Sequence, residues 1–207
     1  MLYSCPVGVR NEVIEATLRV IAADGFRAVT IRRIAKEVGR STSAITHYFA
    51  DRDELLRETV QAALTDRRAC ADSVSKVAED PVWAFLEWSI DADPVGVWAA
   101  VMAASAAGIE PEIVEQARAF DEWWGTHLAR LLEGRCPDGI DPMDVVQAIG
   151  IAVDGLLVGI DASRADVPHR HRLLHLLVDP LVRPLGPGRD YAPISAASPP
   201  VISSSSS

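Results

Sequence analysis

The sequence predicts an all-α protein, on three observations. Apolar residues recur at i, i+3, i+4 and i+7 along most of the chain, which is the period of an amphipathic helix. No stretch alternates apolar and polar residues well enough to predict a strand, and the chain contains no internal repeats. Four of the places where an acidic residue precedes a proline are taken as helix starts, for which this pattern is typical: Asp80-Pro81, Asp93-Pro94, Glu110-Pro111 and Asp141-Pro142.

Three helices are expected in the N-terminal segment. The first covers residues 10–24 and ends at Gly25. Thr30 can cap the second, which ends at Gly39 and has one apolar stripe: Ile31, Ile34, Ala35 and Val38. Ser41 can cap the third, whose inward residues are Ala44, Ile45, Tyr48 and Phe49. Two short amphipathic helices joined at a glycine form the helix-turn-helix pattern.

The outward face of the third helix suits the DNA major groove. It carries small or hydrogen-bonding side chains and no acid: Thr42, Ser43, Thr46 and His47. The net charge of the chain, −9, is an objection to DNA binding. However, residues 1–57 hold nine Lys and Arg against seven Asp and Glu, whereas residues 58–207 hold 11 against 22. The N-terminal part is therefore mildly basic, and the acidic remainder disfavours non-specific binding to nucleic acid.

A long helix is expected to follow, from Asp51 to about Val77. At 1.5 Å per residue it would be roughly 40 Å long and would connect two domains. Asp51 and Glu54 form a capping-box variant at its start. Arg52 lies in the first turn, where a cation is unfavourable for the helix, so we interpret it as a phosphate contact. A solvated arginine is the alternative interpretation.

The segment 39–56, GRSTSAITHYFADRDELL, resembles the signature of TetR-family (tetracycline-repressor-like) transcriptional regulators. The resemblance implies an all-helical homodimer with an N-terminal helix-turn-helix domain that binds a double-stranded DNA operator. It implies phosphate contacts from Tyr48 and Arg52. The chain departs from the family pattern at Thr46, commonly tyrosine, and at Arg52, commonly lysine. The expected DNA-binding residues are Thr30, Arg40, Ser41, Thr42, Ser43, Ala44, Thr46, His47, Tyr48 and Arg52.

We expect three parts in the chain. Residues 1–57 form the DNA-binding domain, residues 58–183 a helical ligand-binding and dimerisation domain, and residues 184–207 a disordered tail rich in Pro, Gly, Ala and Ser. In the second domain helices are expected at 81–90, 94–107, 111–133, from 142 onward, and at 168–182. The helix at 94–107 is apolar nearly all round, which predicts that it is buried.

The last two helices are expected to form the dimer interface. Small side chains on one face allow close approach of another helix: Ala148, Ala152, Gly155 and Gly159. The final helix adds Leu173 and Leu177. The resemblance implies dimerisation through a four-helix bundle; an ordinary core helix is the alternative. A membrane span is disfavoured because Gln147 and Asp154 interrupt the apolar run. Residues 152–157, AVDGLL, are also similar to the betaine-responsive repressors of this family.

The five tryptophans of the chain all follow residue 58, and core packing or a ligand cavity could explain them. For a cavity, the expected ligand contacts are Trp83, Trp88, Trp98, Met102, Phe120, Trp124, His127 and Asp154. Aromatic faces beside carboxylates suit a cationic or amine-bearing effector. A neutral or lipophilic molecule is the more general expectation for such a site.

Other patterns predict no chemistry. His169, His171 and His175 cluster near the C-terminus, but the sequence shows no carboxylate or cysteine beside them to complete a metal site. No nucleophile, phosphate-loop or zinc-protease motif is present, so neither an enzyme nor a cofactor is expected. The three cysteines are far apart and no signal peptide precedes them, which predicts reduced thiols in the cytoplasm.

The sequence therefore predicts a ligand-responsive repressor, released from a palindromic operator by a small molecule. Two alternatives remain open. One is a helical interaction protein that no longer binds DNA, and the other is a ligand-processing enzyme.

Overall fold

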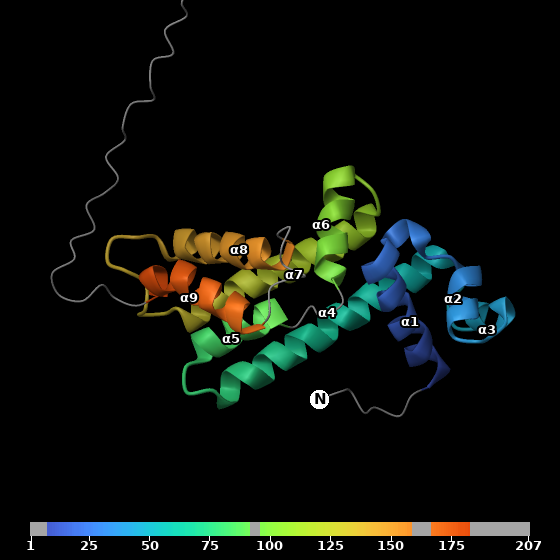
Figure 1. The fold of residues 1–207 in the computed structure, drawn as a ribbon, viewed down its shortest axis with the longest axis horizontal. Helices are drawn as coiled ribbons and strands as arrows, with labels where there is room; N and C mark the ends of the chain where they lie inside the picture. Colours follow the sequence, from blue (N-terminus) through green and yellow to red (C-terminus); the bar gives the residue numbers. More distant parts are fainter. Residues whose placement is uncertain (1–7, 92–95, 159–166, 183–207) are drawn as a thin grey trace, which may run out of the picture.

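Helices form all the regular secondary structure of the described residues, in two groups joined by one long helix (Figure 1). The computed structural model describes residues 8–91, 96–158 and 167–182. The expected all-α class and domain order are confirmed. Gly159 of the predicted dimer interface and the predicted tail at 184–207 lie outside the described residues.

The N-terminal group comprises α1 (Val9–Asp24), α2 (Ile31–Glu37) and α3 (Thr42–Thr46), with a single 3-10 turn at Phe26–Ala28. The connecting helix is α4 (Arg52–Val77). The second group lies along it and comprises α5 (Pro81–Asp91), α6 (Val97–Ala107), α7 (Pro111–Leu131), α8 (Pro142–Val158) and α9 (Val167–Val182).

The predicted caps define the N-terminal helices. The Thr30 side chain accepts from the N–H of Arg33 at 3.1 Å, and Ser41 accepts from the N–H of Ala44 at 3.2 Å. Asp51 caps α4 by accepting from the N–H of Glu54 at 2.8 Å. Gly39 has φ +65°, a conformation that favours glycine, and so ends α2 before the turn to α3.

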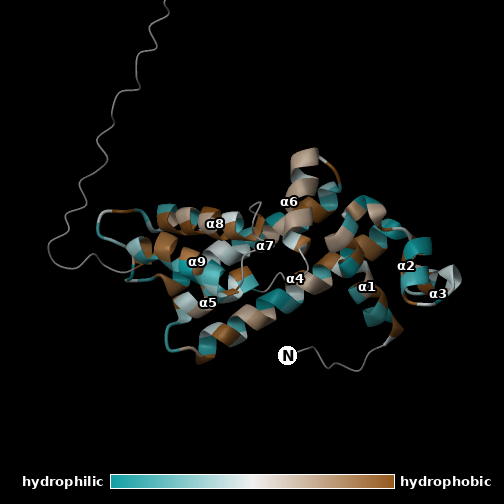
Figure 2. Ribbon diagram, viewed as in Figure 1, coloured by the Kyte–Doolittle hydropathy of each residue, from teal (hydrophilic) through white to brown (hydrophobic). Residues whose placement is uncertain are grey.

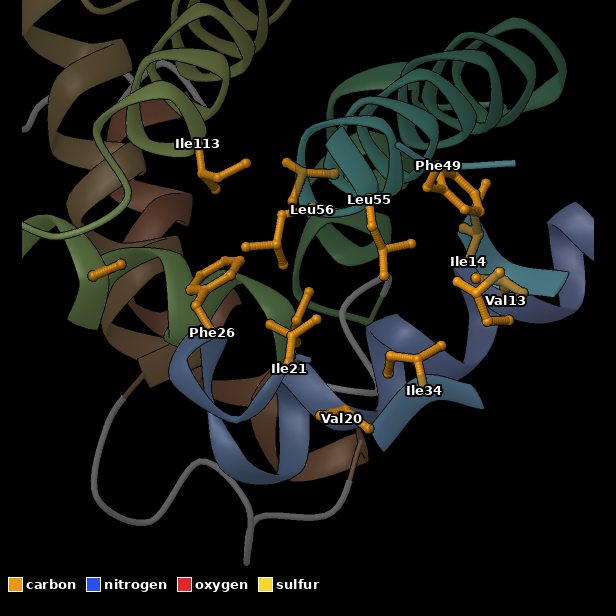
Figure 3. Packing of buried hydrophobic residues seen from close by; sticks show 14 of the residues in the cluster. Val13, Ile14, Val20, Ile21, Phe26, Ile34, Phe49, Leu55, Leu56 and Ile113 are labelled. Atoms are coloured by element: carbon orange, nitrogen blue, oxygen red, sulfur yellow. The ribbon is translucent and has the colours of Figure 1, made fainter. Parts of the chain in front are cut away.

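The core of the DNA-binding domain continues into the second group of helices. Ile113 of α7 belongs to the same apolar cluster as Phe26 and Leu56 (Figure 3). Val101 and Ala104 of α6 also join this cluster. A fully buried isoleucine contributes about 1.5–3 kcal/mol. The apolar cluster of the DNA-binding domain therefore extends beyond the boundary expected at residue 57, into α6 and α7.

The prediction for α6 was wrong in its start and its burial. The helix begins at Val97, after Gly96 with φ +70°. Only Val101 and Ala104 are buried, and Met102 is 39% exposed, although apolar residues run along the whole helix (Figure 2). The physical reason is that α6 packs mainly against α1, α7 and α8 and leaves the rest of its surface to solvent.

A second core holds α5, α7, α8 and α9 together. α7 buries one face, which carries Ile113, Ala117, Phe120, Trp124 and Leu128, and Leu132 directly after the helix is also buried. α8 buries the face that carries Val145, Ile149 and Val153. α9 buries the face that carries Leu174, Val178 and Val182. None of the described helices is both long and apolar enough to cross a membrane.

Candidate DNA-binding surface and ligand cavity

α3 presents the predicted polar face to solvent. Thr42, Ser43, Thr46 and His47 are exposed, whereas Ile45 and Phe49 are fully buried. Tyr48 was expected on the inward face as well as on phosphate, and it is 40% exposed. Its ring meets His47 edge-on, with centroids 5.1 Å apart. The tyrosine therefore lies at the surface beside the face expected to enter the groove.

Several predicted DNA-binding side chains already have intramolecular partners. The hydroxyls of Ser41 and Ser43 lie 2.9 Å apart, and Thr46 donates to the carbonyl of Ser43 at 3.3 Å. Arg40 forms an ion pair with Glu12 at 3.2 Å. Within the described residues, Thr42 and His47 are the exposed polar side chains of α3 without a side-chain hydrogen bond.

Arg52, for which the sequence predicted a phosphate contact, has intramolecular partners in the structure. Its Nε donates to the carbonyl of Val29 at 2.9 Å, and its Nη2 donates to the carbonyl of Phe26 at 3.0 Å and to Glu110 at 2.7 Å. The hydrogen bond to Glu110 raises the pKa of Arg52 further above its usual value. The fold brings residues 26–29 and the start of α7 to this guanidinium. Arg52 therefore connects the two domains instead of reaching outward.

Two cations that the sequence analysis did not select are exposed on α2. Arg32 and Lys36 are one turn apart and lie outside the apolar stripe of that helix. The signal for them was present, because cations at i and i+4 on the outer face of the first helix of a helix-turn-helix are placed to contact phosphate.

A small cavity lies among α4, α5, α6, α7 and α8. Its volume is about 30 Å³, which is room for water rather than for a ligand. Four predicted ligand residues line it: Trp98, Phe120, Trp124 and Asp154. The sequence analysis did not predict the other lining residues, Arg67, Ser89, Asp121, Gly150, Val153 and Leu157.

The cavity combines aromatic rings with two carboxylates. Trp98 Nε1 donates to Asp154 at 2.9 Å, and Trp124 Nε1 donates to the hydroxyl of Ser89 at 3.0 Å. Burial raises the pKa of Asp154. Partial burial also raises the pKa of Asp121, which is exposed on its outer side and lies close enough to Asp154 for mutual repulsion. A cation entering here would meet ring faces and two carboxylates that lack full hydration.

An open acidic groove adjoins the cavity between α7 and α8. It has a volume of about 680 Å³ and shares Asp121, Trp124, Gly150 and Asp154 with the cavity. Glu122 and Asp144 add two further carboxylates to its lining. The groove gives the cavity a route to solvent along an acidic surface.

The other four predicted ligand residues lie elsewhere. Trp83 stacks on His175 at 3.9 Å, and Trp88 donates to Cys70 Sγ at 3.2 Å. Met102 is not among the residues that line the cavity and is exposed. His127 is buried between the rings of Phe85 and Trp123, and its burial lowers its pKa. Trp83, Trp88 and His127 therefore pack against other side chains, which was the alternative interpretation.

Two of the three histidines near the C-terminus lie beside carboxylates that the sequence analysis did not identify. His171 Nε2 lies 2.8 Å from Asp91, and His175 Nε2 lies 3.1 Å from Glu87. The carboxylates come from α5, far away in the sequence, which is why the sequence analysis missed them. These pairs join α9 to α5.

The outer faces of α8 and α9 expose apolar side chains. Ala148 and Gly155 are exposed, Ala152 and Leu173 are half-buried, and Leu177 is 51% exposed. Ile151 and Leu176 are exposed by 72% and 74%. Large apolar side chains gathered on two neighbouring helices are typical of an association surface.

Comparisons with known proteins place this chain among bacterial regulators. The model of the bacterial regulatory proteins of the tetR family matches residues 13–59. The HTH-type transcriptional regulator BetI 1 of Chromohalobacter salexigens is 28% identical over 172 residues, which cover 75% of this chain and 84% of that protein. The HTH-type transcriptional repressor AcnR of Corynebacterium efficiens is 34% identical over 71 residues, 34% of this chain and 36% of AcnR.

The fold is also similar to solved structures. A transcriptional regulator from Saccharomonospora viridis, solved in complex with choline, superposes with a TM-score of 0.70. Its sequence is 20% identical, and the match covers 84% of this chain and 97% of that one.

Proposed function

Because this chain belongs to the TetR family of bacterial regulatory proteins, we propose that it is a repressor released from operator DNA by a cationic small molecule. Its relatives are described as HTH-type transcriptional regulators, one of them a repressor. The observation that carries the proposal is the presence, in one fold, of an exposed helix-turn-helix face and a small cavity lined by aromatic and acidic side chains.

DNA binding rests on α3 and α2. Thr42 and His47 supply exposed groups for base edges, and Tyr48 lies beside them for phosphate. Arg32 and Lys36 take over the phosphate contact first expected of Arg52. The protein acts where operator DNA is found, in the cytoplasm.

The proposed effector carries a quaternary ammonium or another organic cation. Trp98, Phe120 and Trp124 offer ring faces, and Asp121 and Asp154 offer negative charge. The choline found in the Saccharomonospora regulator and the similarity to BetI 1 support the same class. The cavity is too small for choline in the ligand-free form, so binding must separate the helices around it. This movement provides the coupling to DNA.

The functional unit is proposed to be a homodimer that associates through α8 and α9. Ile151, Leu176 and Leu177 expose apolar surface that would be more stable out of water. A second copy of the chain provides an apolar face of the same kind to pack against it. A two-fold dimer presents two copies of α3 and therefore requires a roughly palindromic operator.

Fluorescence anisotropy with the DNA upstream of the protein's own gene tests the proposal. We expect a shift at low protein concentration that choline reverses. The neutral carbon analogue of choline, 3,3-dimethylbutanol, has nearly the same shape and should be inactive, because it lacks the charge. Equal release by both molecules would exclude cation recognition, and failure to bind the fragment would exclude autoregulation through it.

A further inference from the structure

Two neighbouring arginines of α4 are stacked among aromatic rings of the second domain. The guanidinium of Arg67 lies over the rings of Trp88 and Phe120, at 5.2 and 5.6 Å from their centroids. The guanidinium of Arg68 lies 5.8 Å from Phe120 and 5.4 Å from Trp123. Cations and rings thus alternate along the contact between α4, α5 and α7.

Only the first of these arginines reaches the cavity. Arg67 lines it together with Phe120, Asp121 and Asp154, whereas Arg68 does not. Arg68 instead donates to the carbonyl of Ala119 at 3.0 Å, on the backbone of α7. The guanidinium of Arg67 therefore lies over an aromatic face in a cavity that also holds two carboxylates. A bound organic cation would use the same ring and the same carboxylates.

We propose that Arg67 is an internal cation that occupies the effector cavity in the ligand-free protein, and that a cationic effector binds by displacing its guanidinium. This inference rests on the proposed function. The available volume supports displacement over simple addition, because about 30 Å³ cannot hold choline beside Arg67. The face of Phe120 is already covered by the guanidinium, so the effector and Arg67 compete for it.

Displacement of Arg67 provides a link to DNA. Arg67 belongs to α4, an uninterrupted helix that begins at Arg52 beside the DNA-binding domain. When its guanidinium leaves Phe120, α4 loses one of its contacts with α5 and α7. The neighbouring Arg68 keeps its contact with the backbone of α7, so α4 is expected to pivot about that point. The effector thereby changes the position of the helix that carries the DNA-binding domain.

The variant Arg67→Ala tests the competition, with Arg68→Ala as the matched control from the same stack. The dissociation constant for choline would be measured by tryptophan fluorescence, and DNA release by anisotropy. Arg67→Ala should bind choline about tenfold more tightly than the natural protein, because no internal cation is displaced. It should also lose most of the release of DNA at saturating choline. Arg68→Ala should not tighten choline binding.

A second probe makes the test independent of the natural effector. Methylguanidinium reproduces the end of the arginine side chain, and it should bind Arg67→Ala while leaving the natural protein unaffected. Binding to the variant without any binding of choline would support the occupancy by Arg67 and refute choline as effector. Equal binding of methylguanidinium to both proteins, or weaker choline binding by the variant, would overturn the inference. Arg67→Gln, which keeps the stem of the side chain, replaces Arg67→Ala if that variant does not fold by circular dichroism.

Discussion

Arg52 and Glu110 form a charged hydrogen bond of 2.7 Å that joins the start of α4 to the start of α7. Both side chains are mostly buried, with 30% and 20% of their surfaces exposed. Glu110 is the only non-glycine residue with positive φ in the described chain, at +52°. A second ion pair, Arg57–Glu112 at 3.5 Å, lies beside it. If ligand binding moves α7, as the proposed function requires, this hydrogen bond is placed to carry the movement to α4 and to the loop at Phe26, whose carbonyl Arg52 also binds.

The first prediction tests whether Arg52 serves the contact with Glu110 or binds phosphate. Arg52→Ala leaves two carbonyls and the Glu110 carboxylate without their donor, which should cost about 2 kcal/mol of unfolding free energy. Its effect on the salt dependence of DNA binding should be small, because the guanidinium contacts protein. Lys36→Ala is the control and should lower the salt slope by about one unit without a loss of stability. If Arg52→Ala also lowered the slope of DNA affinity against salt concentration, Arg52 would be a phosphate contact after all.

The second prediction concerns sequence recognition by α3. Thr42→Ala and His47→Ala should change which bases are preferred, at roughly 1 kcal/mol for each affected position. Tyr48→Phe should weaken binding to all sequences alike, because a phosphate contact carries no base information. Selection of bound fragments from a random DNA pool measures both effects. A changed consensus for Tyr48→Phe, with none for His47→Ala, would contradict the assignment.

Local patterns in the sequence predicted the parts of this fold that depend on local chemistry. The caps at Thr30, Ser41 and Asp51 were predictable because a side chain and its own helix start are enough to form them. The inward residues Ile45 and Phe49 followed from helical spacing. Both bounds of α7 and the start of α8 were close to prediction for the same reason.

Features that depend on distant parts of the chain were not predictable. Arg52 lies near Glu110 only because α7 packs on α4, and the sequence contains no local signal of that pairing. Five tryptophans indicated a cavity, but only two of them line it, since the others fill the core. Arg67 was missed because its role depends on rings from two other helices.

The third prediction is a pH dependence of effector binding. Burial raises the pKa of Asp154 above its ordinary 3.8 in the ligand-free protein. The protonated carboxyl therefore adds to the free energy of unfolding at low pH, and this contribution is lost as the pH rises through the raised pKa. A bound cation favours the ionised carboxylate, and choline should therefore bind more tightly as the pH rises through the same range. Arg67 and Asp121 also face this carboxylate and moderate the effect.

Asp154→Asn is the variant that tests this assignment. The amide oxygen can still accept from Trp98 Nε1, so the packing is retained while the charge is removed. This variant should bind choline more weakly, and its affinity should depend less on pH. The double variant with Asp121→Asn should lose the remaining pH dependence. Fluorescence titrations over the pH range in which the protein stays folded measure both. An unchanged pH profile in the double variant would place the titrating group outside the cavity.

The last prediction tests the dimer. Ile151→Glu and Leu177→Glu each place a carboxylate on the outer faces of α8 and α9, where the native side chains are 72% and 51% exposed in one protomer. A single protomer should tolerate both changes, because the new charge remains in water. In a dimer the charge would be buried without a partner, which costs several kcal/mol. Light scattering should therefore show monomers. Their helicity should be unchanged by circular dichroism, and their operator binding should be weaker.

Val77→Glu is the matched control. Val77 is 85% exposed at the end of α4, away from α8 and α9, so that variant should remain dimeric. Dimers in all three variants would assign the exposed apolar face to another partner.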